Sequence, residues 1–214
     1  MKHVVFLLVS LWITTGAQSQ TLGVLKYSGG GDWYSNPTAL PKLIEFCNNN
    51  LGTTLDPQVK TVTLNSEELF DYPWIHMTGH GNVYFSESEI ETLKEYLKGG
   101  GFLHIDDNYG MDPYIRPLLS GLFSDSPLTE LPTSHPIFSE FYKFPLGLPK
   151  IHAHDNKPPQ AFGIILEGRL ALLYTYESDL SDGWEDPRVH NDPESVRQNA
   201  LKMGANLIHY VFSH

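Results

Sequence analysis

The sequence predicts an α/β fold in which a mostly parallel sheet carries helices on both faces and an antiparallel hairpin at one edge. Strand and helix patterns alternate through the first two thirds of the chain, and two strands joined by a short turn follow later. Three apparently buried strands each end in a loop dense in Gly, Asp, His and Asn, namely SGGGDWY, GHGN and DDNYGMD. Because ligands bind beyond the carboxyl ends of the strands in open α/β sheets, these loops predict one shared site.

The first residues predict a secretory signal rather than a part of the fold. Lys2 gives a basic start, residues 4–13 form an apolar run, and Ala17 and Ser19 supply the small residues of a cleavage site. The run is shorter than the ~20 residues that cross a bilayer, and no later segment approaches that length. We therefore expect residues 1–19 to be removed, and the remaining chain to form a single soluble domain, residues 20–214, that is exported and either periplasmic or secreted.

The composition limits the partners and the forces that hold the domain. The chain is acidic, with a formal net charge of -11, and such a surface repels phosphate backbones. Nucleic acid is therefore not an expected partner. The single cysteine, Cys47, cannot form an intramolecular disulfide, so the core must hold the domain. A hydrophobic content of 41% is sufficient for that core.

The elements of the first half follow from hydrophobic periodicity and capping residues. The expected strands are residues 22–27, 59–64 and 74–78. Residues 40–51 predict a helix with one apolar face, and Cys47 lies on that face, so it is expected in the core. A second helix begins at Ser86, where Glu89 completes a capping box, and ends at the three glycines of residues 99–101.

The second half is less regular. The expected elements are a strand at residues 102–105, a helix at 113–123 and a hairpin formed by 164–166 and 170–176. Residues 128–160 are rich in Pro and aromatics without a sustained period, which predicts an ordered insertion. The last helix is expected to have Asp192 as its cap and Pro193 in its first turn. Its apolar stripe comprises Val196, Ala200, Met203, Leu207 and Val211.

The loop of residues 28–34 is the first candidate ligand-binding segment. Its glycines allow a ligand to approach the backbone, while a carboxylate and an aromatic ring suit the hydroxyls and the flat face of a sugar. Gly30, Asp32 and Trp33 are therefore candidate ligand-binding residues. A phosphate cradle is disfavoured, because the Lys-Ser/Thr ending is missing. A glycine turn against a packed Trp33 is an equally good interpretation.

The turn Thr78-Gly79-His80-Gly81-Asn82 lies where α/β hydrolases carry an exposed nucleophile. Its central residue is His80, with no Ser or Cys beside it, so a Ser or Cys triad is disfavoured. His80 is instead a candidate for catalysis, metal binding or donation to an anion, and Asn82 is a candidate for ligand binding. The alternative is a turn histidine that is hydrogen-bonded to the backbone.

Polar residues also straddle the end of the strand at residues 102–105. Alternation predicts His104 and Asp106 on one face and Asp107 on the other. Adjacent carboxylates near a buried edge are costly unless they are paired, hydrogen-bonded or metal-bound, so we expect a ligand or cation here. Asp106 and Asp107 are candidate catalytic residues, Asn108 a candidate ligand-binding residue and His104 a candidate metal ligand. Alternatively, Asp107 caps the turn that follows.

Two later segments carry further candidates. The string HAHD offers two imidazoles on one side of an extended segment together with a carboxylate, a pattern that can bind a divalent metal. The segment 177–194 holds seven acidic residues and is a solvated loop, a lid, or a loop that binds calcium or a sugar, although its spacing does not match an EF-hand. The candidates are Trp184 for ligand binding and His152, His154, Asp155 and His190 for a divalent metal.

Seven strings together give the chain a family resemblance: GGGDWY, TGHGN, GGGFLHIDDNYGMD, HPIF, GLPKIH, EGR and DGWEDPRVHNDPE. With them the chain resembles the bacterial family Domain of Unknown Function 4159 over nearly all of its mature length. The resemblance implies a flavodoxin-like domain of the class I glutamine amidotransferase-like fold, similar also to trehalose-utilisation (ThuA-like) proteins. It places His80, Asp106, Asp107 and His135 near the usual active edge. The catalytic Cys of true amidotransferases has no counterpart, which argues against glutaminase activity.

Two functions of different classes fit these residues. One is a non-catalytic binding or assembly module of the cell envelope that holds a glycan or another small polar ligand, and the missing nucleophile favours it. The other is a hydrolase, with or without a divalent metal, that acts on a carbohydrate or other polyhydroxylated substrate. The convergence of titratable groups at the strand ends favours this second function.

Overall fold

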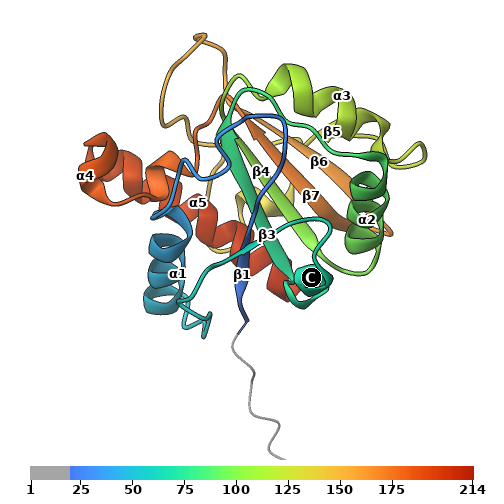
Figure 1. The fold of residues 1–214 in the computed structure, drawn as a ribbon. Helices are drawn as coiled ribbons and strands as arrows, with labels where there is room; N and C mark the ends of the chain where they lie inside the picture. Colours follow the sequence, from blue (N-terminus) through green and yellow to red (C-terminus); the bar gives the residue numbers. More distant parts are fainter. Residues whose placement is uncertain (1–19) are drawn as a thin grey trace, which may run out of the picture.

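The computed structural model describes residues 20–214, and they form an α/β fold around one seven-stranded sheet (Figure 1). The strands are β1 (Leu22–Leu25), β2 (Lys60–Val62), β3 (Trp74–His80), β4 (Phe102–Tyr109), β5 (Thr129–Glu130), β6 (Gln160–Leu166) and β7 (Arg169–Tyr176). Their order is β2-β1-β3-β4-β7-β6-β5. The first five in this order are parallel, whereas β6 and β5 join antiparallel at one edge. The predicted fold class is confirmed, and the predicted signal segment lies outside the described residues.

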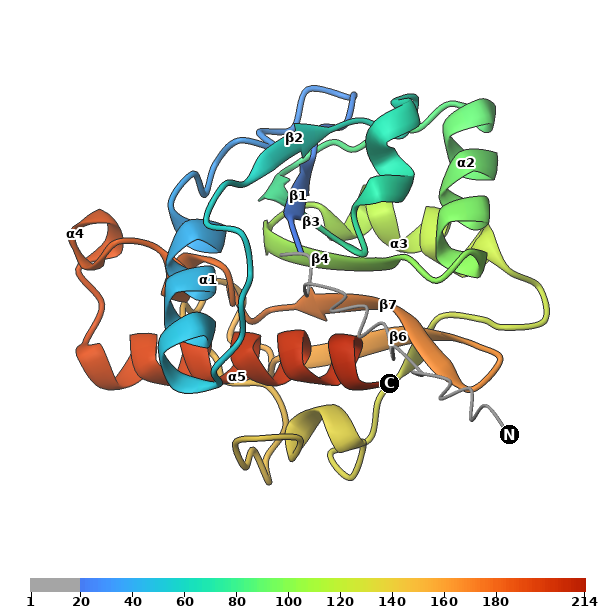
Figure 2. The ribbon, with the colours of Figure 1, turned by 90° about the horizontal axis from the view of Figure 1, so that it is seen from below.

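Helices cover both faces of the sheet. The helices are α1 (Ala39–Asn50), α2 (Glu87–Lys98), α3 (Asp112–Leu122), α4 (Pro187–His190) and α5 (Glu194–Ser213), with short 3-10 turns η1 (Glu67–Asp71), η2 (Pro136–Phe138) and η3 (Asp182–Trp184). Figure 2 shows α1 and α5 on one side of the sheet and α2 and α3 on the other. Each side has its own core of buried apolar residues, so the sheet is buried on both faces.

Local signals explain where several elements begin and end. The Ser86 side chain accepts from the Glu89 backbone N–H, and the Glu89 carboxylate accepts from the Ser86 N–H, so the predicted capping box opens α2. Cys47 is fully buried in α1, as expected of a core residue. The predicted cap of α5 is wrong, because Pro193 occupies the N-cap position. The Asp192 carboxylate binds a histidine instead.

The strand β4 is longer than its apolar run. It continues through Asp106, Asp107 and Asn108 to Tyr109, so these three polar residues lie within the sheet rather than in a loop beyond it. Pairing with β3 and β7 supplies backbone partners on both sides and extends the strand past the point where hydrophobicity ends. The carboxyl edge of the sheet is therefore polar and buried at once.

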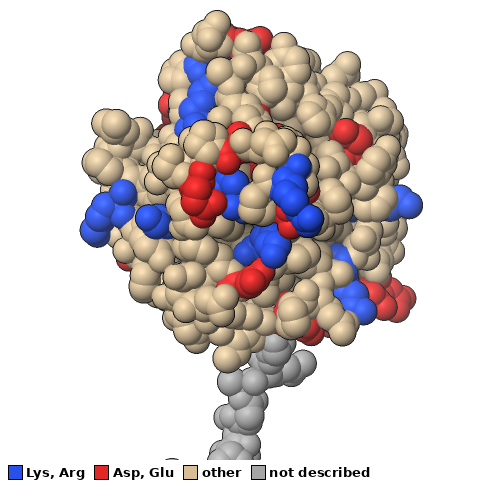
Figure 3. All heavy atoms as spheres, turned by 90° about the vertical axis from the view of Figure 1, so that its left-hand side faces the viewer, with Lys and Arg blue, Asp and Glu red and all other residues tan. Residues whose placement is uncertain are grey.

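The surface adds two constraints. On the face drawn in Figure 3, Lys and Arg are interspersed with Asp and Glu among many uncharged residues, so the net negative charge does not gather there into one patch. Within residues 20–214, no helix has the length and apolar character needed to cross a membrane.

Candidate functional site

The register of β3, β4 and β7 places their polar side chains side by side. Thr78 lies opposite Asp106, and Asp106 lies opposite Thr175. Two residues earlier in β3 and β4, His76 lies opposite His104. All five side chains are buried, and alternation puts them on the face covered by α1 and α5. This row forms the floor of the candidate site.

Asp106 connects the floor of the candidate site to the segment after β7 through hydrogen bonds. Its Oδ2 accepts hydrogen bonds from the backbone N–H of Ser181 at 2.7 Å and from the Ser181 hydroxyl at 2.6 Å, while its Oδ1 accepts from the Thr175 hydroxyl at 2.5 Å. Burial raises the pKa of Asp106 to about 7, although these hydrogen bonds oppose the rise. Asp106 is fully buried, so it positions the residues around Ser181 rather than meeting a ligand from solvent.

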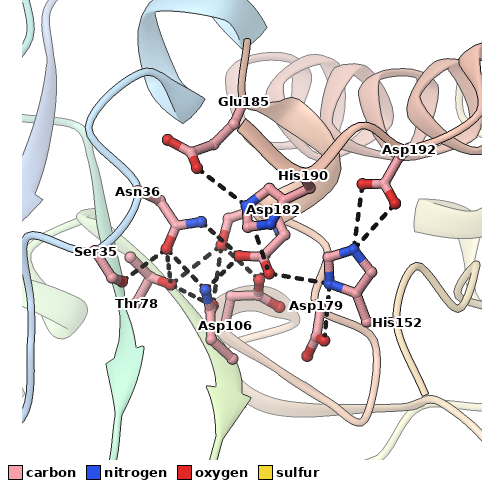
Figure 4. Close-up of polar contacts among 12 residues, drawn as sticks. Ser35, Asn36, Thr78, Asp106, His152, Asp179, Asp182, Glu185, His190 and Asp192 are labelled. Atoms are coloured by element: carbon pink, nitrogen blue, oxygen red, sulfur yellow. Dashed lines mark hydrogen bonds and ion pairs between the residues drawn. The ribbon is translucent and has the colours of Figure 1, made fainter. Parts of the chain in front are cut away.

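Two asparagines fix the carboxylate of Asp182, the first residue of η3. The side-chain N–H groups of Asn36 and Asn108 both donate to its Oδ1, the Asn36 bond at 2.6 Å. Asn108 also donates to the Asn36 side-chain oxygen at 2.7 Å and accepts from the Thr78 hydroxyl at 2.6 Å. With Oδ1 occupied from behind, Oδ2 is the oxygen of Asp182 that faces the neighbouring histidines (Figure 4).

Two histidines converge on that oxygen. The Nδ1 of His152 lies 3.1 Å from Oδ2 of Asp182, and the Nε2 of His190 lies 3.8 Å from it. One ligand atom from each of these three residues lies within 4.8 Å of the other two. The opposite nitrogen of His152 lies 3.1 Å from the Asp192 carboxylate. The cluster therefore has two nitrogen atoms and one oxygen atom that point to a common centre.

Further carboxylates surround this cluster. Asp179 contacts His152 Nδ1 at 3.4 Å and His154 Nε2 at 2.5 Å through one oxygen, while its other oxygen, Oδ1, is buried without a hydrogen-bond partner. Glu185 lies 3.1 Å from Nε2 of His190. The Asp179 and Asp182 carboxylates raise the pKa of His152 to about 10, so in the absence of metal this histidine is an imidazolium held between carboxylates.

The arrangement suits a divalent transition-metal ion. Two imidazoles and one carboxylate are a ligand set found in catalytic zinc and non-haem iron sites, in which the remaining positions bind water or substrate. The ligands are also oriented from behind, His152 by Asp192 and Asp182 by the two asparagines, as is typical of metal ligands. The side chains of His152 and His190 are 26% and 30% exposed, so an ion here could be reached from solvent.

A pocket of about 330 Å³, which we call the Tyr109 pocket, opens beside the cluster. Its walls include Tyr109, His154, Asp155, Lys157, Tyr176 and Asp179. The Tyr109 ring stacks on the His154 imidazole with 4.6 Å between ring centroids. Asp179 both lines this pocket and contacts His152, so it connects the pocket to the cluster.

The structure brings some of the predicted site residues together and separates others. His152, His190 and Asn108 join the cluster directly, while His154 and Asp155 line the adjacent Tyr109 pocket. His104 does not reach the cluster and instead contacts His76 through their Nδ1 atoms at 3.1 Å. Asp107 accepts from the backbone N–H groups of residues 109, 111 and 112, so it caps the turn before α3, as the alternative interpretation predicts.

The glycine-rich loops form a separate group. Asp32 accepts from the His80 backbone N–H at 2.5 Å and contacts the His80 ring at 3.0 Å, in a largely exposed pair. Gly30 and Asn82 are exposed beside them, and Trp33 lines a second cavity. Trp184 is fully buried and donates to the backbone of α5, so its predicted role in ligand binding is wrong. His135 caps η2, away from the cluster.

Sequence reasoning did not single out several residues of the site: Asn36, Thr78, Asp179, Ser181, Asp182 and Asp192. Asp179, Asp182 and Asp192 lie within the acidic segment 177–194. The apolar residues Leu180 and Trp184 indicate that part of this segment is buried, but they do not show which of its acids belong to the site. Asn36 carries no such signal, because its role depends on contacts with residues far along the chain.

The family comparison agrees with the sequence resemblance. A family model described as Domain of unknown function (DUF4159) matches residues 21–212, a range that includes every residue of the cluster. No curated protein matches the sequence. The chain therefore belongs to the DUF4159 family, a domain family of unknown function.

Proposed function

We propose that this chain is a metal-dependent hydrolase that binds a divalent ion through His152, Asp182 and His190. The observation that carries the proposal is the convergence of three ligand atoms within 4.8 Å of one another. Such an ion lowers the pKa of a bound water toward neutrality. Asp179, whose Oδ2 lies 3.4 Å from Nδ1 of His152, would be the carboxylate that accepts a proton from that water.

The substrate class follows from the Tyr109 pocket. Its walls combine the aromatic rings of Tyr109 and Tyr176 with the charged groups of Asp155, Lys157 and Asp179. Rings that stack on a sugar face and side chains that bind hydroxyls suit a carbohydrate or another polyhydroxylated molecule. The basic start and apolar run of residues 1–19 support export, so we place the substrate outside the cytoplasm. ThuA-like proteins share a Gly-His-Gly turn, and the turn Gly79-His80-Gly81 of this chain therefore supports a relation to them.

A non-catalytic glycan-binding module of the cell envelope is the second candidate. One observation favours it: the predicted catalytic pair does not converge, because Asp106 is buried within the floor while His80 is exposed beside Asp32. In that function, the ion and the Tyr109 pocket would hold a ligand without turnover.

The metal content of the purified protein tests whether the chain binds a divalent ion. The protein purified without chelator should hold one divalent ion per chain, and EDTA should lower its melting temperature. His190→Ala should abolish binding, whereas His80→Ala, at a histidine outside the cluster, should leave it unchanged. Asp192→Asn, which touches the site only through His152, should weaken affinity by roughly 10–100-fold. Equal zinc affinity in the wild type and His190→Ala would refute the proposed ligand set.

Turnover separates the two candidates. Nitrophenyl glycosides and nitrophenyl acetate are suitable chromogenic probes for hydrolysis of a glycosidic or ester bond. If the chain is a hydrolase, Asp179→Asn should retain the ion and lose hydrolysis, because the residue lies beside the cluster without being one of its three ligands. A metal-loaded protein that binds oligosaccharides but cleaves neither probe class would favour the binding module.

A further inference from the structure

A second cavity, which we call the Trp33 cavity, lies apart from the Tyr109 pocket. It has a volume of about 310 Å³ and is enclosed by β1, β2, β3 and the start of α1. Its walls include Trp33, Tyr34, Leu40, Val59, Thr61 and His76. Most of these side chains are apolar or aromatic, so the cavity favours an apolar molecule.

The buried polar side chains that line the Trp33 cavity already have hydrogen-bond partners, with one exception. Thr78 bonds to Asn108, and the amide of Asn36 bonds to Asp182 and Asn108. His76 is 1% exposed, and its Nε2 is buried with no hydrogen-bond partner. An unpaired polar atom at this depth costs free energy unless a bound molecule pairs with it.

When Asp106 is ionised, the hydrogen-bond chain behind His76 makes its Nε2 an acceptor. The Thr175 hydroxyl then gives its one hydrogen to Asp106 or to the Ile105 carbonyl, so His104 Nε2 donates to Thr175. Burial holds the pKa of His104 well below its usual range, so the ring is neutral and its Nδ1 has no hydrogen.

The hydrogen between the two rings therefore belongs to His76. Its Nδ1 donates to His104 Nδ1 across 3.1 Å. Burial lowers the pKa of His76 to about 3, so this ring is also neutral and its Nε2 carries a lone pair. Because Nδ1 faces β4, the Nε2 edge turns toward β1 on the other side of β3, where the Trp33 cavity lies.

We propose that the Trp33 cavity binds a small aromatic molecule whose single hydroxyl or N–H group donates to Nε2 of His76. The cavity shares Asn36 and Thr78 with the network that holds Asp182, but the proposal needs no bound metal. A sugar fits the cavity poorly, since the floor offers one free acceptor and the remaining hydroxyls would be buried without partners. Trp33 is therefore assigned to an aromatic ligand rather than to a glycan.

Two probes that differ only in the donor test the proposal. 4-Ethylphenol carries a hydroxyl, and 4-ethylanisole has a methyl group in place of its hydrogen. Titration calorimetry or ligand-observed NMR with the full chain should show that 4-ethylphenol binds roughly tenfold more tightly, the effect of one buried hydrogen bond. Equal affinity for the two probes, or binding of neither at millimolar concentration, would overturn the proposal.

Variants on β2 show whether the probe occupies this cavity. Thr61 is exposed and lines the cavity, so Thr61→Trp should block it and abolish 4-ethylphenol binding. Lys60→Trp places the same ring at the adjacent exposed residue, on the opposite face of the sheet, and should bind as the wild type does. Unchanged binding in Thr61→Trp would contradict the assignment.

A variant of His76 tests the acceptor itself. His76→Phe keeps a flat ring but has no lone pair, so its preference for 4-ethylphenol over 4-ethylanisole should disappear. A tenfold preference that persists in a folded His76→Phe protein would show that another group accepts the hydrogen bond. If this buried variant does not fold, the two probes and Thr61→Trp still decide the question.

Discussion

The buried imidazoles of His76 and His104 should make the protein sensitive to mild acid. Burial lowers the pKa of His76 to about 3 and holds that of His104 well below its usual range, with the charge of His76 as a second cause for His104. In the unfolded chain both titrate near pH 6.5, so their contribution to stability is complete above that pH and is lost as the pH falls. At pH 5, proton uptake by the unfolded state costs about 2 kcal/mol of stability for each histidine.

Asp106 acts in the opposite direction, because its pKa is raised to about 7 and it holds a proton in the folded state that the unfolded state releases. The slope of the free energy of unfolding against pH therefore combines both effects. The difference in slope between the wild type and a histidine variant isolates the contribution of that histidine. His104→Gln should reduce the slope of the free energy of unfolding between pH 5 and 6 by about 1.4 kcal/mol per pH unit, the effect of one proton.

Urea denaturation followed by fluorescence at several pH values in EDTA measures this slope. Trp74→Phe is the control, since Trp74 stacks on His76 and is buried but does not titrate. It should lower stability equally at every pH and leave the slope unchanged. If His104→Gln kept the wild-type slope, His104 would have to be protonated in the folded protein, and the hydrogen-bond chain assigned to it would be wrong.

Four further substitutions probe the frame of the site and the helices around the sheet, and urea or thermal denaturation measures each. Above pH 7, where Asp106 is ionised, Asp106→Asn should destabilise by about 1–3 kcal/mol, because an amide cannot accept all the hydrogen bonds from Ser181 and Thr175; a stability equal to that of the wild type would contradict this. Gly183→Ala should cost about 1–3 kcal/mol, since its new Cβ would lie 2.4 Å from the facing alanine methyl of α5. The matched change Gly121→Ala, in α3 with open space around it, should instead stabilise by about 0.5–1 kcal/mol. Ser86→Ala should cost about 1 kcal/mol through loss of the capping box, and no change would show that α2 is held by packing alone.

Much of the fold could be predicted because its signals are local. The Ser86 capping box and the apolar face of α1 depend on residues three or four positions apart. The end of β4 could not be predicted in the same way. Hydrophobicity stops at Ile105, yet the strand continues because distant partners, among them Ser181 and Thr175, satisfy the polar side chains beyond it.

The site could be predicted only in part, because it too depends on contacts between residues that are far apart in the chain. His152 and His190 were recognisable as metal candidates from residue type alone, but the carboxylate between them was not. Seven acids lie in the segment 177–194, and the sequence offers no means of choosing among them. Asp182 is distinguished only by Asn36 and Asn108, which are 146 and 74 residues away along the chain.

The cost of this arrangement favours a functional role for Asp182. Asn36, Asn108 and Thr78 are all buried, and apolar side chains of the same shape would avoid the loss of hydration. Their hydrogen bonds converge on one oxygen of Asp182 and leave the other facing His152 and His190. A network that served only stability would be expected to satisfy both oxygens with donors that stay neutral. Here the second oxygen meets two imidazoles, whose nitrogens are ligands for a metal once their protons are removed. The orientation of Asp182 is therefore the one that the proposed metal site requires.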